Sequence, residues 1–396
     1  MKIQFNDAAF SFQLLRVLGS AASRQADVGE ALATAQRIRE GDFESWATEW
    51  SRTAARVEAI AETCVKAGRR VSAGEAYLRA TNYFRAAEFF LHGTPSDPRV
   101  QELSGRSGWC FREGLRLCEI PHQFVDIPYE GTTLPGIFYP ASGDRRPTLI
   151  AQTGFDGTID GLMHWALAAT RRGWHCLTFE GPGQGRVIRT QNLPFRPDWE
   201  HVISPVVDAL VARPDVDASR VVLLGVSFGG YLAPRAAAFE KRLAACIANG
   251  GVLDFSGSRL PPGMTREQFA TAVREHPDRV NTGMRKLAES NTAARWSQEN
   301  GMYTFHASSP ANWVGKLLDY DLTPVVEQIT CPMLVIDVEH EDNFPGEARK
   351  LYDALSCPKT WLFFSEEEGA GDHCQTGSPT LAQQRIFDWI EETVDS

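Results

Sequence analysis

A serine in a glycine-rich turn is the residue of this sequence whose setting points most directly to chemistry. The segment GVSFG, residues 225–229, has the pattern Gly-x-Ser-x-Gly between a strand-like apolar run and a segment with helical spacing. In such a turn, side chains two before and two after Ser227 would clash, so both positions are glycine. The turn lifts the hydroxyl above a sheet and directs the following amides toward a substrate. A helix-capping serine is the alternative interpretation.

A serine hydroxyl is a weak nucleophile and needs a base. His373 lies between the last predicted strand, residues 359–364, and the last predicted helix, which is where a base for this turn is expected. The acid that orients the histidine should follow the predicted strand 331–337, in the loop DVEHEDNFP. We predict Asp342 as that acid, with Glu341 as the alternative.

Two backbone amides are needed to stabilise the negative oxygen that forms during attack on a carbonyl. We predict the amide of Phe228, which follows the serine, and that of Phe155, in the segment TGFDG after the predicted strand 147–152. Glycines in that segment permit close backbone approach. Asp156 either caps the following helix or contacts a polar group of the substrate, and we include it among the predicted substrate-binding residues.

The sequence contains no pattern that predicts a cofactor or a metal. The segment FEGPGQGR, residues 179–186, lacks the Gly-Lys-Ser/Thr ending and the GxGxxG spacing of nucleotide-binding loops, so we expect a tight turn that shapes a pocket wall. The eight cysteines include no CxxC pair, which leaves a zinc site without support.

Apolar runs and helical segments alternate from about residue 121 onward, and this alternation predicts how the chemical residues are positioned. The segment HQFVDIPYEGTTLPGIFYP reads as a hairpin with Glu130-Gly131 in its turn. Short apolar runs follow, separated by helical patterns, which predicts a doubly wound, mostly parallel sheet with an antiparallel edge. The predicted strands are PTLIAQ, WHCLTFE, SRVVLLG, LAACIANG, CPMLVID and KTWLFF.

Two further regions are predicted to be helical. Residues 1–118 form an N-terminal domain, interpreted as a cap with its own core, whose aromatic residues either fill that core or also reach a pocket. Residues 119–396 form the sheet-containing core, interrupted at about 254–328 by a helical insertion before the penultimate core strand. Because such an insertion lies at the carboxyl edge of the sheet, we predict that its Tyr303 and Trp313 contact substrate.

The composition excludes several classes of protein. Hydrophobic residues make up 43% and charged residues 23% of the 396 positions, which rules out a disordered chain, a collagen-like fibre and a disulfide miniprotein. The net charge of −10 argues against binding to nucleic acid or to anionic membranes. No run approaches the length of a membrane span, and the N-terminus makes a poor signal peptide. We therefore expect a cytoplasmic protein.

Several motifs together resemble the α/β-hydrolase superfamily. They are AYLRATNYFRAAEFFLHG, QTGFDG, FEGPGQG, GVSFGGYLAPRAAAFEKRLAACIANGG and GDHC, and they extend from about residue 70 to the end. Within the superfamily, the chain looks like the group that contains the dihydroxypseudooxynicotine hydrolase, the fungal heptaketide chain-shortening hydrolases and the fermentation–respiration switch esterases.

The resemblance implies an α/β-hydrolase fold and a serine-dependent hydrolase for a small molecule. Ser227 matches the nucleophile, His373 the base and Asp342 the acid, although Val338 stands where the family often has glycine, which leaves Glu341 open. Some members cleave a C–C bond next to a ketone in aromatic or polyketide substrates. Family habit also suggests a homodimer. The alternatives are acyl transfer, cyclisation or lyase chemistry with the same residues, and a non-catalytic binding protein.

Overall fold

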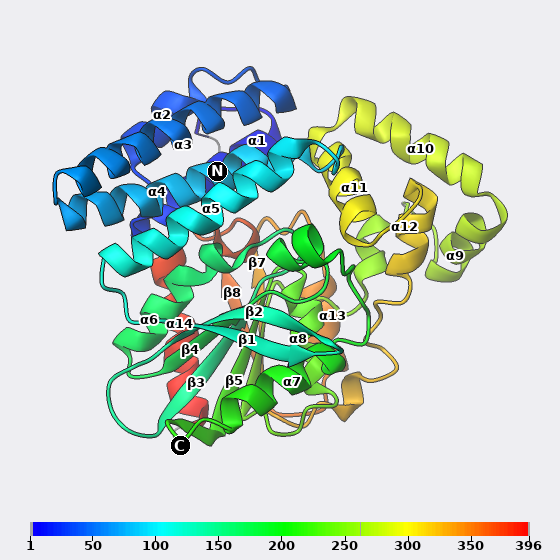
Figure 1. The fold of residues 1–396 in the computed structure, drawn as a ribbon. Coiled ribbons are helices and arrows are strands. Elements are labelled where there is room, and N and C mark those ends of the chain that lie inside the picture. The colour runs from blue at the N-terminus through cyan, green and yellow to red at the C-terminus, as the bar shows by residue number, and fades with distance from the viewer. Residues whose placement is uncertain (1–2, 262, 395–396) are drawn as a thin grey trace. The chain divides into compact units, whose positions relative to one another are not determined.

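The strands of the chain form one sheet in the computed structural model, which describes residues 3–261 and 263–394. Within those residues the sheet has eight strands in the order β1-β2-β4-β3-β5-β6-β7-β8 (Figure 1). Pairing is parallel from β4 through β3 to β8 and antiparallel between β1, β2 and β4. The bounds are β1 Gln123–Tyr129, β2 Thr132–Tyr139, β3 Arg146–Gln152, β4 His175–Phe179, β5 Val216–Val226, β6 Ala245–Asn249, β7 Met333–Val338 and β8 Lys359–Phe364. The predicted fold class is confirmed.

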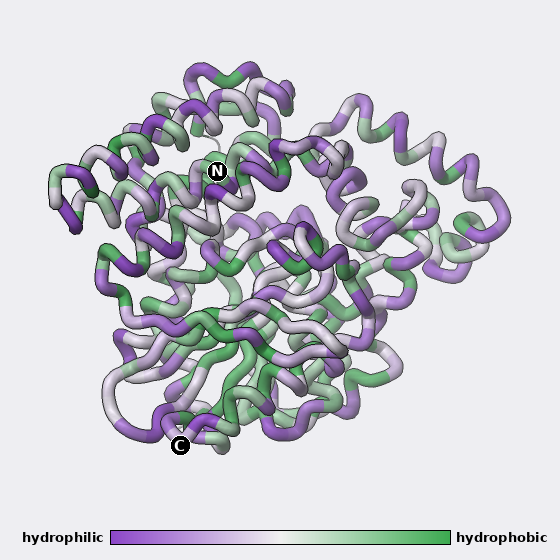
Figure 2. Tube along the Cα trace, in the orientation of Figure 1, coloured by the Kyte–Doolittle hydropathy of each residue, from purple (hydrophilic) through white to green (hydrophobic). Residues whose placement is uncertain are grey.

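The antiparallel edge of the sheet is the predicted hairpin. β1 and β2 are separated by Glu130 and Gly131, whose φ angles are 38° and 82°. Two consecutive positive φ angles are typical of the tight turns that match the twist of a two-stranded ribbon. The strands between this edge and β8 are apolar because helices cover the sheet, and Figure 2 shows them mainly in the hydrophobic colour.

The helices that pack on the sheet alternate with its strands. α6 packs on β3 and β4, α8 on β5 and β6, and α13 on β7. The bounds are α6 Met163–Arg171, α7 Glu200–Val211, α8 Gly229–Ala237, α13 Glu347–Ala354 and α14 Pro379–Val394. Each strand therefore leads into a turn at its carboxyl end, and these turns carry the residues predicted to do chemistry.

The N-terminal region is helical, as predicted, and has an aromatic core of its own. α3 packs against α4, and α4 against α5. Trp46, Trp50 and Tyr83 are fully buried there, and the rings of Trp46 and Trp50 lie 5.8 Å apart. The bounds are α1 Ala8–Gly19, α2 Val28–Ala35, α3 Phe43–Lys66, α4 Arg70–Glu88 and α5 Pro98–Leu117.

The chain divides into two compact units that are not continuous in sequence. The first contains the N-terminal residues through His122, together with Lys286–Tyr303 and Thr376–Pro379, and the second contains the sheet and the remaining residues. The insertion is helical and is shared between them. Its helices are α9 Arg266–Glu275, α10 Pro277–Ser290, α11 Thr292–Thr304 and α12 Pro310–Leu317.

α11 joins the first unit through buried contacts with the segment that follows α4. The indole N–H of Trp296 donates to the carbonyl of Phe89 at 3.0 Å, and the two rings stack at 4.5 Å. His92 is hydrogen bonded to Asn300 at 2.7 Å and to Glu88 at 2.8 Å. The interpretation of residues 1–118 as a cap remains a prediction.

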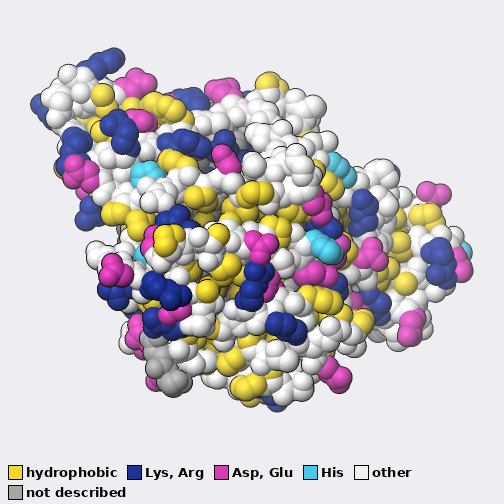
Figure 3. Space-filling model, turned by 60° about the horizontal axis from the view of Figure 1, so that its bottom comes forward, with side chains coloured by type: hydrophobic (Ala, Val, Ile, Leu, Met, Phe, Trp, Pro, Cys, Tyr) yellow, Lys and Arg dark blue, Asp and Glu magenta, His cyan; other side chains and the backbone are white. Residues whose placement is uncertain are grey.

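Charged side chains of both signs are interspersed on the face of the molecule shown in Figure 3. None of the helices within the described residues is long and apolar enough to cross a membrane.

Candidate active site

Ser227 occupies the turn between β5 and α8, in a backbone conformation that few side chains adopt. Its φ is 64°, in the left-handed region, and such strain persists only where the surroundings hold it. The Ser227 amide donates to the carbonyl of Asn249 at the end of β6 at 2.8 Å, and its carbonyl accepts from the Gly230 amide at 2.6 Å. The neighbouring strand and the first turn of α8 therefore fix the serine in place.

The glycines around Ser227 differ in how severely a side chain at their positions would clash with neighbouring backbone. A Cβ at Gly225 would lie 1.9 Å from the Gly229 carbonyl oxygen, which confirms the predicted clash on that side. A Cβ at Gly229 would lie 3.0 Å from the Thr153 carbonyl oxygen, a milder conflict than predicted. The second severe position is Gly230, where a Cβ would lie 2.1 Å from the Gly250 carbonyl oxygen.

Ser227, His373 and Glu341 form a continuous row of hydrogen bonds. His373 Nε2 lies 2.8 Å from Ser227 Oγ, and Nδ1 lies 2.8 Å and 2.6 Å from the two carboxylate oxygens of Glu341. The histidine follows β8 and the glutamate follows β7, so three strand ends meet here. The side chains of His373 and Glu341 are only 8% and 6% exposed.

The structure corrects the predicted acid, because Glu341 and not Asp342 is bonded to His373. The Glu341 carboxylate also accepts the amides of Asn343 at 3.0 Å and Phe344 at 3.2 Å, which closes a turn around it. Asp342 lies within that turn and is exposed. The alternative raised from the sequence, Glu341, is thus the residue that faces the histidine.

The buried pair perturbs the ionisation of both groups. Burial by itself would lower the pKa of His373, but Cys374 and Glu341 raise it well above its ordinary value. Burial by itself would raise the pKa of Glu341, but the charge of His373 and hydrogen bonds from His373, Asn343 and Phe344 lower it. A carboxylate held ionised beside the imidazole stabilises the positive charge that the ring acquires when it takes a proton.

Cys374 is a residue near this row that the sequence analysis did not single out. Its sulfur lies 3.4 Å from His373 Nε2 and 3.4 Å from the Asn249 carbonyl oxygen. Cys374 has φ 54°, and the next residue, Gln375, has φ 53°. The only signal in the sequence was its place directly after the histidine. Its thiol is half-buried, next to the nitrogen that faces Ser227.

The segment after β3 packs directly against the serine turn. A Cβ on Gly154 would lie 2.5 Å from the Phe228 nitrogen, so only glycine permits this approach. The Phe228 amide has no hydrogen-bond acceptor within the part of the chain that the structure describes. The peptide that contains the Phe155 amide thus begins beside the amide of Phe228, although the sequence separates the two phenylalanines widely.

Aromatic rings connect this segment to the histidine. Phe228 and Phe255 stack with ring centroids 4.0 Å apart, and Phe344 lies 5.7 Å from the His373 ring. Trp313 is buried, and its ring is nearly parallel to that of Phe155 at 6.4 Å. The connected set is Phe155, Phe228, Phe255, Phe305, Trp313 and Phe344.

The other two predicted substrate-binding residues are placed differently. Tyr303 belongs to the first compact unit, where its ring lies 5.5 Å from that of His92. Asp156 is half-buried beside Phe155. The N-cap residue of the short helix at Ile159–Leu162 is Thr158. Contact of either residue with a substrate remains a prediction.

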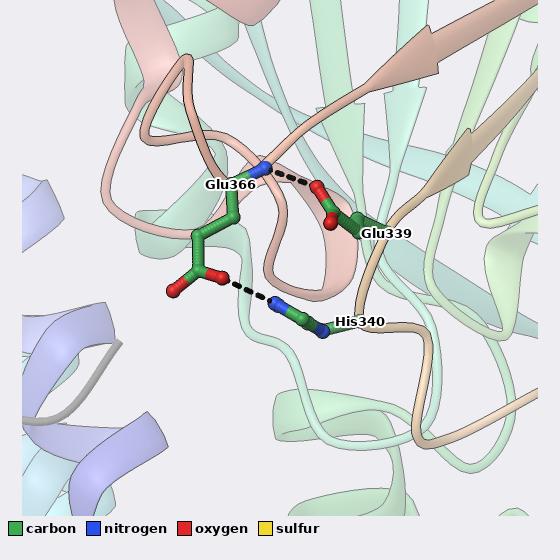
Figure 4. A group of neighbouring side chains, drawn as sticks. All are labelled: Glu339, His340 and Glu366. Carbon is green, nitrogen blue, oxygen red and sulfur yellow. Dashed lines mark hydrogen bonds and ion pairs between the residues drawn. The ribbon is translucent and has the colours of Figure 1, made fainter.

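Three exposed side chains tie the loop after β7 to the loop after β8 (Figure 4). The amide of Glu366 donates to Glu339 at 2.7 Å, and His340 Nε2 lies 2.9 Å from the Glu366 carboxylate. Within the described residues this is the one group of three potential metal ligands, with all ligand atoms within 4.8 Å of one another. Its internal bonds connect the two loops that carry Glu341 and His373.

Comparison with known proteins agrees with the fold. A model of the alpha/beta hydrolase family matches residues 140–386, and one described as esterase FrsA-like matches residues 12–256. The chain belongs to the alpha/beta hydrolase family, and the resemblance stated from the sequence is confirmed.

Individual relatives extend over nearly the whole chain. Hydrolase LUC6 of Fusarium sp is 34% identical over 410 residues, which cover 98% of this chain and 97% of the relative. The 20-hydroxy-prefusarin hydrolase FUS2 of Gibberella moniliformis is 34% identical over 405 residues, covering 97% and 96%. The crystal structure of the 2,6-dihydroxy-pseudo-oxynicotine hydrolase has a TM-score of 0.74 at 20% identity and covers 95% of each chain, which supports the fold.

Proposed function

We propose that this chain is a serine hydrolase that acts through Ser227, His373 and Glu341 and forms an acyl-enzyme. The observation that carries the proposal is the position of His373 Nε2, 2.8 Å from Ser227 Oγ, while Glu341 holds Nδ1. This fixes the ring so that Nδ1 carries the proton and Nε2 accepts one. The base is within direct reach of the hydroxyl that it must activate.

The first half of the reaction forms the acyl-enzyme. His373 Nε2 takes the proton of Ser227 Oγ as the oxygen attacks the substrate carbonyl carbon. The amides of Phe228 and Phe155 stabilise the resulting oxyanion, and one such donor contributes about 3 kcal/mol. The tetrahedral intermediate then collapses, and His373 returns the proton to the leaving group.

The second half releases the acid product. His373 takes a proton from water as the water oxygen attacks the acyl carbon, and the imidazolium then returns that proton to Ser227 Oγ as the acid product leaves. Glu341 remains ionised throughout and stabilises the imidazolium. None of these steps calls for a metal or an organic cofactor.

The substrate class that the site supports best is a bulky aromatic or polyketide-like small molecule, cleaved at an ester or at a C–C bond beside a ketone. The aromatic set around Phe155 and Phe228 favours planar or apolar groups. The buried indole N–H of Trp313 has no partner within the described residues, which leaves a donor for a polar group of the substrate. A carbon leaving group must delocalise its negative charge as an enolate. The relative FUS2 is named for 20-hydroxy-prefusarin, and a related substrate chemistry is part of the proposal.

A cytoplasmic location is also part of the proposal. All eight cysteines are free thiols. Free thiols are typical of proteins that work in a reducing compartment.

The decisive experiment compares Ser227→Ala with Ser308→Ala on p-nitrophenyl esters and on β-diketones. Ser308 is exposed, and its backbone amide donates to Asn312 Oδ1, so the loss of its hydroxyl should leave turnover unchanged. Ser227→Ala should abolish turnover and leave the melting temperature close to that of the original protein. Turnover that survives in Ser227→Ala would refute the proposal.

The mass of the product separates hydrolysis from the other reactions that the same residues can catalyse. In hydrolysis the summed mass of the products exceeds the mass of the substrate by one water. Acyl transfer to another molecule, cyclisation and lyase chemistry add no water. The proposal requires incorporation of one ¹⁸O atom from labelled water into the acid product.

A further inference from the structure

The glycine-rich segment FEGPGQGR after β4 contains a glutamine whose side chain is fully engaged with backbone. Gln184 is 1% exposed. Its Nε2 donates to the carbonyl oxygens of Thr153 at 2.8 Å and Gly154 at 3.2 Å. Its Oε1 accepts the amide of Gly181, in its own turn, at 2.9 Å. The side chain therefore bridges the turn after β4 and the segment after β3.

One of these bonds fixes the direction of the Phe155 amide. The carbonyl of Gly154 and the N–H of Phe155 belong to the same peptide, and the described residues contain no cis peptide. In a trans peptide these two groups point in opposite directions. Because Gln184 holds the Gly154 carbonyl, the Phe155 N–H points away from Gln184. Glycine at 154 would otherwise let this peptide rotate at little cost.

The same segment holds the other end of the loop. The carboxylate of Glu180, which is also buried, accepts the amides of Ile159 and Arg186, each at 2.8 Å. A Cβ at Gly185 would lie 2.0 Å from this carboxylate, so a side chain at this position would displace the carboxylate. Side chains of the turn after β4 thus bind the loop 153–159 at both ends. These contacts fix the position of the loop relative to the Ser227 turn.

We propose that Gln184 is a positioning residue, which orients the Gly154–Phe155 peptide so that its N–H serves as the second oxyanion donor. This inference rests on the proposed function and extends it to a segment that the sequence predicts only as a tight turn shaping a pocket wall. Gln184 does not need to touch substrate. Its loss should therefore reduce kcat, which depends on the charged transition state, more than it changes KM.

The test is Gln184→Glu, which keeps the shape of the side chain and its acceptor for the Gly181 amide. An ionised carboxylate cannot donate to the two carbonyls and repels them. We expect kcat to fall by about 100-fold, the effect of losing one oxyanion donor, with KM within a few-fold. Affinity for an arylboronic acid, which forms a tetrahedral adduct with a serine, should fall in parallel.

The pH dependence distinguishes positioning from simple damage to the fold. A protonated carboxyl group regains one donor, so the ratio of variant to original kcat should rise as the pH falls. The requirement for neutral His373 applies to both proteins and cancels in that ratio. Gln184→Met, which has neither donor nor charge, should show the same loss of kcat at every pH, and it serves also if Gln184→Glu does not fold.

Gln191→Glu is the matched control. Gln191 Nε2 donates to the Thr133 carbonyl at 2.8 Å and its Oε1 accepts from Thr132 at 3.0 Å, a similar arrangement on the β2 side of the sheet. This variant should retain kcat and boronate affinity. If Gln184→Glu and Gln184→Met retain kcat within twofold, or lose kcat without losing boronate affinity, the positioning role is overturned. Failure of the proposed function itself would appear separately, as turnover that survives in Ser227→Ala.

Discussion

Replacing Glu341 with glutamine tests how the histidine is held. In the structure one carboxylate oxygen of Glu341 lies 2.8 Å from His373 Nδ1 and also accepts the amides of Asn343 and Phe344, while the other oxygen lies 2.6 Å from Nδ1. In Glu341→Gln the amide oxygen retains the two backbone bonds, and the NH₂ group takes the place of the closer oxygen.

An NH₂ group donates, so it favours the tautomer in which Nδ1 accepts and Nε2 carries the proton. Nε2 then cannot accept the proton of Ser227. The equivalent change in a serine protease triad lowers kcat by about 10⁴-fold. That factor corresponds to about 5.4 kcal/mol of transition-state stabilisation. We expect a loss of this order here, because the pair is nearly sealed from water and the variant leaves no carboxylate to stabilise the imidazolium.

The assay is kcat/KM on a p-nitrophenyl ester, measured for Glu341→Gln and for the neighbouring control Asp342→Asn. Asp342 is exposed, and its variant should retain the original rate. Melting temperatures should show that both variants are folded. A large loss in Asp342→Asn with little loss in Glu341→Gln would refute the assignment, since it would restore the acid predicted from the sequence.

Three further predictions follow from the site. The neighbours of His373 raise the pKa of its ring, and the reaction needs the neutral ring. We therefore expect kcat/KM to fall as the pH decreases through a pKa above that of free histidine. A pH profile in which kcat/KM falls only below about pH 6.5 would contradict this. Alkylation of Cys374 by N-ethylmaleimide should block turnover, because the Cys374 sulfur lies 3.4 Å from His373 Nε2. Cys374→Ala should be active and should resist N-ethylmaleimide. Equal sensitivity of both proteins to the reagent would refute this prediction. Gly230→Ala should lower the melting temperature, because its Cβ would lie 2.1 Å from a carbonyl oxygen. Gly105→Ala, in a helix with open space around it, should raise the free energy of unfolding by up to about 1 kcal/mol. Similar melting temperatures for the two variants would refute this packing.

Local pattern was enough to predict the sheet and two members of the hydrogen-bonded row. The strands are short apolar runs that helices cover, and the clash that requires glycine at 225 is with Gly229 in the same turn. His373 was identified because it lies between the last strand and the last helix. These features depend on sequence neighbours, so the sequence displays them directly.

Features set by distant contacts were not predicted in this way. The choice of Glu341 over Asp342 depends on how the loop after β7 turns, and the short pairing of His340 with Asp372 fixes that loop against the one after β8. The membership of α11 in the first unit depends on contacts such as that of Trp296 with Phe89, which are far apart in the chain. Gln184 donates to carbonyls 31 and 30 residues before it, which no local pattern indicates.

The proposed mechanism requires that Ser227 becomes covalently acylated during turnover. The direct measurement is peptide mass spectrometry of protein quenched with acid during reaction with a slowly hydrolysed ester. We expect a mass increase equal to one acyl group on the peptide that contains Ser227, and no such adduct in Ser227→Ala. An acyl group found reproducibly on another side chain, with an unmodified Ser227 during active turnover, would contradict it.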